Sequence, residues 1–325
     1  MLSFQTVGTA IKPNEHRPKR RVFDYFLFLF AIAMCIFFSI LSPYFLAVKN
    51  FMNILSSVSI VGIIATGMTL VMITRGIDLS VGSVVASSGC VAAMLMETYK
   101  VSWWGAMIAA LAVGLFIGAL NGVLITKFKV VPFITTLGTM NIARGIAFIL
   151  TNGMAIYTPS KQILFLGAGR IANIIPIPGV IMIAAFTVMW IICRFTVFGR
   201  NVFAIGGNSR ASHLAGIPVD RVKFSIYTIT GGLAAIAGLV MVGLTSTAMP
   251  SAGDGYNLDV ITAVYLGGNS SEGGEGSVWR TLLGVLIIGI LNNGMALLSV
   301  QTYWQTFTKG CLLIVAVIID VIRRR

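Results

Sequence analysis

Uninterrupted apolar runs restrict what this chain can fold into more than any other feature. A helix rises 1.5 Å per residue, so about 20 residues cross the roughly 30 Å hydrocarbon layer of a bilayer. About ten runs are candidates for such helices, and they cover residues 23–47, 53–74, 79–97, 103–126, 131–151, 177–198, 223–246, 258–268, 278–299 and 305–322. The sequence therefore predicts an all-α polytopic membrane protein with about ten transmembrane helices.

Two of the runs are unusual. Residues 258–268 are too short to cross as one straight helix, which predicts a broken or re-entrant span that continues through Gly267 and Gly268. The first run follows a basic segment, as in a signal peptide, but it is long and lacks a small-residue cleavage pattern. We expect it to remain as the first span.

The positions of the charges predict how the chain lies in the membrane. The chain has 23 Lys and Arg against 10 Asp and Glu, and most of the basic residues fall on one side of the predicted spans. Because loops rich in Lys and Arg stay in the cytoplasm, both termini are expected there. Four basic residues are expected outside: Lys49, Lys100, Lys161 and Arg170. Two others, Arg144 and Lys309, lie within spans. Basic residues scattered in this way argue against nucleic acid as a partner.

The predicted organisation is a single transmembrane permease domain over residues 23–322. A basic cytoplasmic segment, residues 1–22, precedes it, and a basic cytoplasmic end, residues 323–325, follows it. No long hydrophilic domain interrupts the spans.

Residues for catalysis or metal binding are scarce. The chain has no GxxxxGK[ST] phosphate loop, and its only histidines are His16 and His213, both outside the spans. Four cysteines lie far apart without CxxC spacing. We therefore predict no catalytic residue, no metal site, no cofactor in this chain and no enzymatic activity.

Acidic residues are also informative. All ten lie at or beyond the ends of predicted spans. Ion-coupled carriers usually hold carboxylates inside the membrane, where these bind the driving ion. The pattern argues against ion coupling, although sodium sites built only from carbonyls leave that alternative open.

Neutral amides and one arginine are the candidates for a translocation pathway. Arg144 lies about 18 Å from the inner surface, by helix rise from Pro132, where a charge must snorkel outward, pair or face water. Amides can hydrogen-bond an uncharged polar solute such as a sugar, or they can join helices to one another. The candidate pathway residues are Asn121, Asn141, Arg144, Asn292 and Asn293.

Two inner segments stand out. In the turn between the second and third spans, Arg75 can pair with Asp78, and Asp78 or Ser80 can cap the third helix. The turn is either purely structural or contacts a partner. The inner loop, residues 199–220, predicts a short helix between an Asn208 cap and a stop at Gly216, with Ala211 and Ala215 on one face. Two turns are not stable alone in water, which favours docking over a solvated loop.

Several ordered motifs after residue 45 make the chain resemble the membrane permeases of ATP-driven sugar importers, the ribose-type family related to the branched-chain amino acid permeases. They are Gly76-Ile-Asp-Leu-Ser-Val-Gly82, Phe133-Ile-Thr-Thr-Leu-Gly-Thr139, Ala143-Arg-Gly145, Phe198 to Asn208, Leu266-Gly-Gly268, Gly273-Gly-Glu-Gly-Ser277 and Leu291-Asn-Asn-Gly294. In that family an inner loop with Glu-Ala-Ala-x-x-x-Gly docks a short helix on the ATPase subunit. Here Ala211 and Gly216 match, while Arg210 and Ser212 replace the acid and the second alanine.

The resemblance implies a subunit of a multi-pass complex in the bacterial inner membrane. It implies a second permease subunit, an ATPase with two nucleotide-binding domains that hold ATP and magnesium, and a periplasmic sugar-binding protein. The ATPase-coupling residues would be Gly199, Arg200, Asn208, Ala211, Ala215 and Gly216. The solute would be a monosaccharide such as ribose, with an amino acid permease of the same class or an ion-coupled secondary transporter as the alternatives.

Overall fold

The structure is a computed structural model that describes residues 17–270 and 272–324, with side chains from residue 27 to residue 322 apart from residue 271. The side chains of the two predicted basic end segments, 1–22 and 323–325, lie outside this range. Within it the chain forms thirteen helices, and its only strands are two residues long. The predicted all-α class is confirmed.

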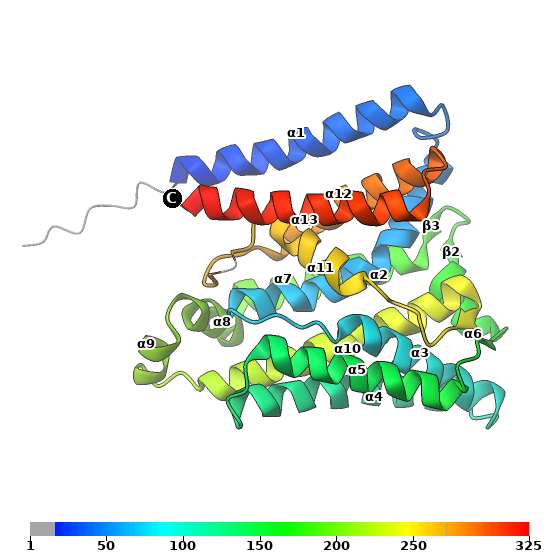
Figure 1. Cartoon of the computed structure of the whole chain (residues 1–325), viewed down its shortest axis with the longest axis horizontal. Helices are drawn as coiled ribbons and strands as arrows, with labels where there is room; N and C mark the ends of the chain where they lie inside the picture. The colour runs from blue at the N-terminus through cyan, green and yellow to red at the C-terminus, as the bar shows by residue number, and fades with distance from the viewer. Residues whose placement is uncertain (1–16, 271, 325) are drawn as a thin grey trace, which may run out of the picture.

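The helices form a bundle in which most lie along one common direction (Figure 1). Figure 1 shows the start of α1 and the end of α13 at the same end of the bundle as α8 and α9, which we call the α9 end. The opposite end, where α6 lies, is called the α6 end. The helices are α1 (Arg17–Leu41), α2 (Val48–Ile73), α3 (Val81–Glu97), α4 (Trp103–Thr126), α5 (Pro132–Thr151), α6 (Lys161–Ala168), α7 (Ile177–Phe195), α8 (Val197–Gly207), α9 (Ser209–Leu214), α10 (Val219–Thr245), α11 (Tyr256–Leu266), α12 (Val278–Leu297) and α13 (Thr302–Arg324).

Seven described helices are long and apolar enough to cross a membrane: α2, α4, α5, α7, α10, α12 and α13. The apolar part of α1 whose side chains are described, Leu27–Leu41, is shorter, as is α3. The predicted runs therefore mark real helices, with ends shifted by several residues. Seven long helices are fewer than the ten predicted spans, because α3 and α11 have only 17 and 11 residues and α1 is described with side chains only from Leu27.

Two of the predicted spans, those containing α3 and α11, are broken. The chain leaves α2 at the α9 end and runs without helix through residues 74–80 before α3 begins inside the bundle (Figure 1). It likewise leaves α10 at the α6 end and turns back into the bundle before α11 (Figure 1). The predicted continuation of α11 through Gly267 and Gly268 is wrong. The helix ends at Leu266 and Gly268 has a φ of 68°, so the non-helical half precedes α11.

The centre of the bundle is formed by α2 and α10. In their most apolar 18-residue windows, 83% of the α2 residues and 72% of the α10 residues are buried, against 11% in α13. The high burial of α10 follows from its close contact with α4. A side chain on Gly114 or Gly118 of α4 would clash with α10 backbone, so glycine at these positions lets the two helices touch. The interface between α4 and α10 is therefore packed backbone to backbone.

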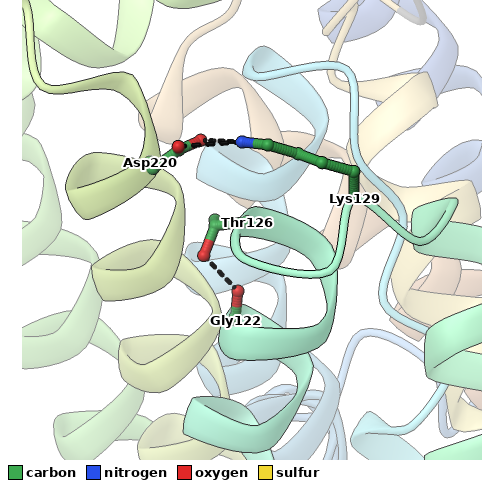
Figure 2. A network of polar contacts seen from close by, with 4 residues as sticks. All are labelled: Gly122, Thr126, Lys129 and Asp220. Atoms are coloured by element: carbon green, nitrogen blue, oxygen red, sulfur yellow. Dashed lines mark hydrogen bonds and ion pairs between the residues drawn. The ribbon is translucent and has the colours of Figure 1, made fainter.

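Short elements lie in the loops where the sequence predicts only irregular chain or a single short helix. At the α6 end, β1 (Ile156–Tyr157) pairs antiparallel with β4 (Thr247–Ala248), and β2 (Arg170–Ile171) pairs with β3 (Ile175–Pro176). At the α9 end, α8 precedes the predicted short helix. Nearby, Lys129 Nζ lies 2.8 Å from Asp220 Oδ1 and joins the α4–α5 turn to the start of α10 (Figure 2).

Candidate functional site

The non-helical halves of the two broken spans bring α3 and α11 together. A Cβ on Gly82, in the first turn of α3, would clash with the carbonyl oxygen of Gly253, and a Cβ on Gly253 would clash with that of Gly82. Only residues without side chains allow this contact. The amino-terminal ends of both helices, which carry partial positive charge, are therefore directed into the bundle.

A polar cavity of about 280 Å³ opens beside this contact. It is lined by Ser83, Met140, Asn141, Arg144, Phe148, Ser251 and Asp254. Two of the five predicted pathway residues, Asn141 and Arg144, are brought together here, one helical turn apart on α5. The Ser83 hydroxyl is buried and has no hydrogen-bond partner within the described part of the chain.

The Arg144 side chain is directed inward rather than along the membrane surface. Its Nη1 donates hydrogen bonds of 2.6 Å to the carbonyl oxygens of Pro250 and Ala252, in the segment that precedes α11. Both contacts lie more than 100 residues away in the chain. This geometry pairs the guanidinium with backbone carbonyl groups at the edge of the cavity, one of the arrangements expected for a charge within an apolar bundle.

Two acidic residues that stand at predicted span ends are nevertheless buried inside the bundle. Asp78 is only 1% exposed, whereas Asp254, which lines the same cavity as Arg144, is exposed. Asp259 is also buried, and its Oδ2 lies 2.8 Å from Lys309 Nζ on α13. These residues do stand at span ends in the sequence, but α3 and α11 begin inside the bundle, so their ends lie there too.

The predicted ion pair between Arg75 and Asp78 is also wrong. Asp78 Oδ1 instead accepts hydrogen bonds from the backbone N–H of Ser80 at 2.9 Å and from its hydroxyl at 2.6 Å. The turn is extended between the two residues, so the arginine points away from the bundle interior. Its guanidinium binds the carbonyl oxygens of Gly206 and Gly207.

Asn121 joins helices and does not line the cavity. Its Nδ2 donates to Ser80 Oγ at 3.0 Å, and its Oδ1 accepts from Thr139 Oγ1 at 2.6 Å. Together with Asp78, these side chains form a buried chain of hydrogen bonds that links the start of α3 to α4 and α5. Of the two roles left open by the sequence, this one agrees with helix joining.

The two asparagines of α12 lie apart from the cavity. Asn293 and Asn50 of α2 exchange two amide hydrogen bonds of 2.9 Å. The neighbouring Asn292 is half-buried, and its Oδ1 lacks a partner among the described residues. The five candidate pathway residues thus do not form one site.

The predicted short helix of the inner loop is present as α9. Asn208 Oδ1 accepts a hydrogen bond of 2.9 Å from the Ala211 N–H, and Gly216 has a φ of 82°, which only glycine adopts readily. Ala211 and Ala215 are exposed, and between them Leu214 is 82% exposed. The sequence did not single out this leucine.

The two remaining residues of the predicted coupling set, Gly199 and Arg200, belong to α8. Gly199 is buried, its N–H donates to Thr196 Oγ1 at 3.1 Å, and a Cβ there would clash with Cys193 backbone. Arg200 is exposed. Gly199 therefore permits the tight corner between α7 and α8, while Arg200 lies on the surface of the α9 end.

A bundle of apolar helices, with broken spans that meet beside a polar cavity, is the architecture of a membrane transport protein. Residues 50–317 match a family model described as the permease component of the branched-chain amino acid transport system. The chain belongs to this permease family. The residue resemblance seen in the sequence is thereby confirmed.

Individual relatives agree over nearly the whole chain. The ribose import permease protein of Bacillus subtilis is 44% identical over 91% of each chain, and that of Escherichia coli K12 is 43% identical over 87% of this chain and 88% of its own. The L-arabinose ABC transporter permease protein of Azospirillum brasilense is 38% identical over 92% of this chain and 86% of its own. No solved structure matches the chain.

Proposed function

We propose that the chain is the membrane-spanning permease subunit of an ATP-driven importer in the bacterial inner membrane, and that its solute is a monosaccharide such as ribose. The observation that carries this proposal is the similarity to ribose import permeases over about nine tenths of both chains. The polar cavity at Arg144 supports it, because a hydroxylated solute needs hydrogen-bonding groups inside an otherwise apolar bundle. The chain is a transport subunit and not an enzyme.

In this proposal the chain crosses the membrane ten times. Seven long helices and α1 each cross once, and α3 and α11 each complete a crossing together with the extended segment before them. The α9 end faces the cytoplasm, and both termini lie there. The distribution of Lys and Arg supports this orientation, since Lys161 and Arg170 fall at the α6 end, whereas most others fall at the α9 end.

The solute passes beside α5, where Asn141 and Arg144 line the cavity. The guanidinium and the Ser251 and Ser83 hydroxyls supply donors for sugar hydroxyl groups, and Asp254 supplies an acceptor. The amino-terminal ends of α3 and α11 add partial positive charge nearby. Because the site contains both signs of charge, it suits a neutral polar solute.

A second copy of the chain covers the outer face of α5. A Cβ placed on Gly138 or Gly145 would meet nothing within 4 Å, and Asn141 between them is exposed. An amide and two glycines on a surface that would otherwise contact lipid are typical of helix–helix interfaces. The cavity would then lie between two permease subunits.

Two further partners complete the complex. An ATPase subunit receives α9 on the cytoplasmic side and holds ATP and magnesium, for which this chain has no phosphate loop. A periplasmic binding protein delivers the sugar at the α6 end. An amino acid as solute is favoured only by the description of the family model, whereas the relatives named above carry sugar names.

Uptake by cells tests the proposed solute. Deleting the gene for this chain should abolish high-affinity uptake of radiolabelled ribose, and a plasmid copy should restore it. Unlabelled L-arabinose, D-allose and branched-chain amino acids are then added as competitors. Competition by an amino acid but not by any sugar would contradict a monosaccharide solute.

A further inference from the structure

The side chain of Arg75 joins two parts of the chain that are far apart in sequence. Its Nε donates to the carbonyl oxygen of Gly206 and its Nη2 to that of Gly207, each at 2.8 Å. These are the last two residues of α8, and the guanidinium closes the carboxyl-terminal end of that helix. Charged donors to carbonyl groups form stronger hydrogen bonds than neutral ones.

Local structure alone does not require an arginine at this position. The end of α2 is already closed by its own backbone, since Arg75 N–H donates to Met72 and Gly76 N–H donates to Val71, both at 2.9 Å. Arg75 has a φ of 63°, a left-handed conformation that costs a residue with a side chain roughly 1 kcal/mol and that glycine adopts freely. Strain of this kind persists where the surroundings fix it.

A third segment meets the same point. The N–H of Gly274, in the loop between α11 and α12, donates to the carbonyl oxygen of Ile73 at 2.9 Å. A Cβ on Gly206 would clash with both groups, so the three backbones touch. We call the contact of residues 73–75, 206–207 and 273–274 the backbone junction.

The backbone junction lies between the proposed coupling helix and both broken spans. Gly207 is followed directly by Asn208, whose side chain caps α9. Asp78 follows Arg75 by three residues and begins the hydrogen-bond chain at the start of α3, while the 273–274 segment follows α11. A displacement of α9 can therefore reach both spans through this junction, at the residues before α3 and after α11, and the Arg75 side chain supplies two of its contacts.

We infer that Arg75 is a positioning residue for transport, which holds α8 to α2 so that movement of α9 is transmitted to the broken spans that border the cavity. This inference rests on the proposed function, because it takes α9 as the contact with the ATPase. Without the arginine, α8 and α9 can move while α2, α3 and α11 remain in place. ATP hydrolysis would then proceed with little solute movement.

The test uses proteoliposomes containing the full complex, with ribose-loaded binding protein and ATP. Arg75→Gln removes the charged fork, Arg75→Lys keeps a charge that reaches only one carbonyl at a time, and Arg194→Gln is a matched control at an exposed arginine of the α9 end. The measured quantity is ribose imported per ATP hydrolysed, which a mere loss of folded protein does not change. Assembly is checked by the amount of ATPase that co-purifies.

Arg75→Gln should import about tenfold less ribose per ATP, because the charged hydrogen bonds to both carbonyl groups are lost, with Arg75→Lys intermediate and Arg194→Gln unchanged. A wild-type ratio in assembled Arg75→Gln overturns the inference. If that variant fails to assemble, a wild-type ratio in Arg75→Lys overturns it equally. Failure of the wild-type complex to import ribose with ATP overturns the proposed function itself.

Discussion

Individual residues in this protein are held by partners that lie far away in the chain. Arg144 binds carbonyl groups of Pro250 and Ala252, and Lys309 pairs with Asp259. Each contact fixes a broken span to a continuous helix, α5 in the first case and α13 in the second. Both of these basic side chains inside the bundle thus have a structural partner. Arg144 also lies at the cavity.

Replacing Arg144 should impair transport. Arg144→Ala removes two hydrogen bonds of a charged donor and a group that faces the solute, so uptake of ribose should fall about tenfold or more. Arg144→Lys should retain part of the activity, because a lysine donates to one carbonyl but lacks the planar fork. Lys161→Ala, at an exposed position of the α6 end, is the control. Normal uptake by Arg144→Ala would place the residue outside the pathway.

The buried ion pair predicts a stability pattern. Asp259→Asn leaves Lys309 without its carboxylate in a mostly buried place, which should destabilise the protein by about 3–5 kcal/mol. Asp259→Asn combined with Lys309→Met should cost less than Asp259→Asn alone, because neither charge then remains unpaired. The exposed pair Lys129–Asp220 serves for comparison, and Asp220→Asn should cost less than about 1 kcal/mol.

Thermal unfolding in detergent, followed by fluorescence or by loss of the monodisperse peak, measures both effects. Equal destabilisation by Asp259→Asn and Asp220→Asn would show that the buried ion pair contributes no more to stability than the exposed one.

At the scale of elements, the fold depends most on α3 and α11, which begin inside the bundle, and on the short helix α9. Apolar length in the sequence predicts the long spans well, because hydrophobic thickness is a property of each segment alone. Asn208 and Gly216 likewise identify the two ends of α9, since capping depends on neighbouring residues. The break before α11 has no such local signal, because it accompanies the contact between Gly82 and Gly253, which only the folded chain brings together.

For the candidate site, too, local features are predictable from the sequence and long-range contacts are not. Amides and an arginine within apolar runs indicate buried polar groups, but the sequence does not identify their partners. Asn121 meets Ser80 and Thr139, from which it is separated by 41 and 18 residues, and no local pattern predicts either contact. The carbonyl acceptors of Arg75 are 131 and 132 residues away and are backbone atoms, so no residue type identifies them.

The exposed face of α9 predicts how the ATPase is bound. Leu214→Asp should weaken co-purification of the ATPase about tenfold or more, because burying a leucine contributes about 1.5–3 kcal/mol.

Gly216→Leu should also impair coupling, since a φ of 82° strains any residue with a side chain. Arg194→Gln is the control for both. Unchanged ATPase binding by Leu214→Asp would exclude α9 as the docking element.

The whole molecule is a bundle with two unlike ends. The α9 end carries α8, α9 and the backbone junction, and the α6 end carries α6 and the short strands (Figure 1). The broken spans enter from opposite ends and meet at the polar cavity. A displacement at either end can therefore reach the same place, as alternating access requires.

Orientation in the membrane can be tested on intact cells. An introduced cysteine at Ser160, before α6, should react with a membrane-impermeant maleimide, whereas one at Ser209, in α9, should react only after permeabilisation. A reporter fused at the C-terminus should be active only if it functions in the cytoplasm. Labelling of the Ser209→Cys variant in intact cells would reverse the proposed orientation.

The central claim is that this chain forms the pathway of an ATP-driven monosaccharide importer. Its most direct test is uptake of radiolabelled ribose into proteoliposomes that contain the chain, its ATPase and the binding protein. The account predicts uptake that requires ATP hydrolysis and that persists when ionophores remove proton and sodium gradients. Uptake driven by an ion gradient in the absence of nucleotide would contradict it.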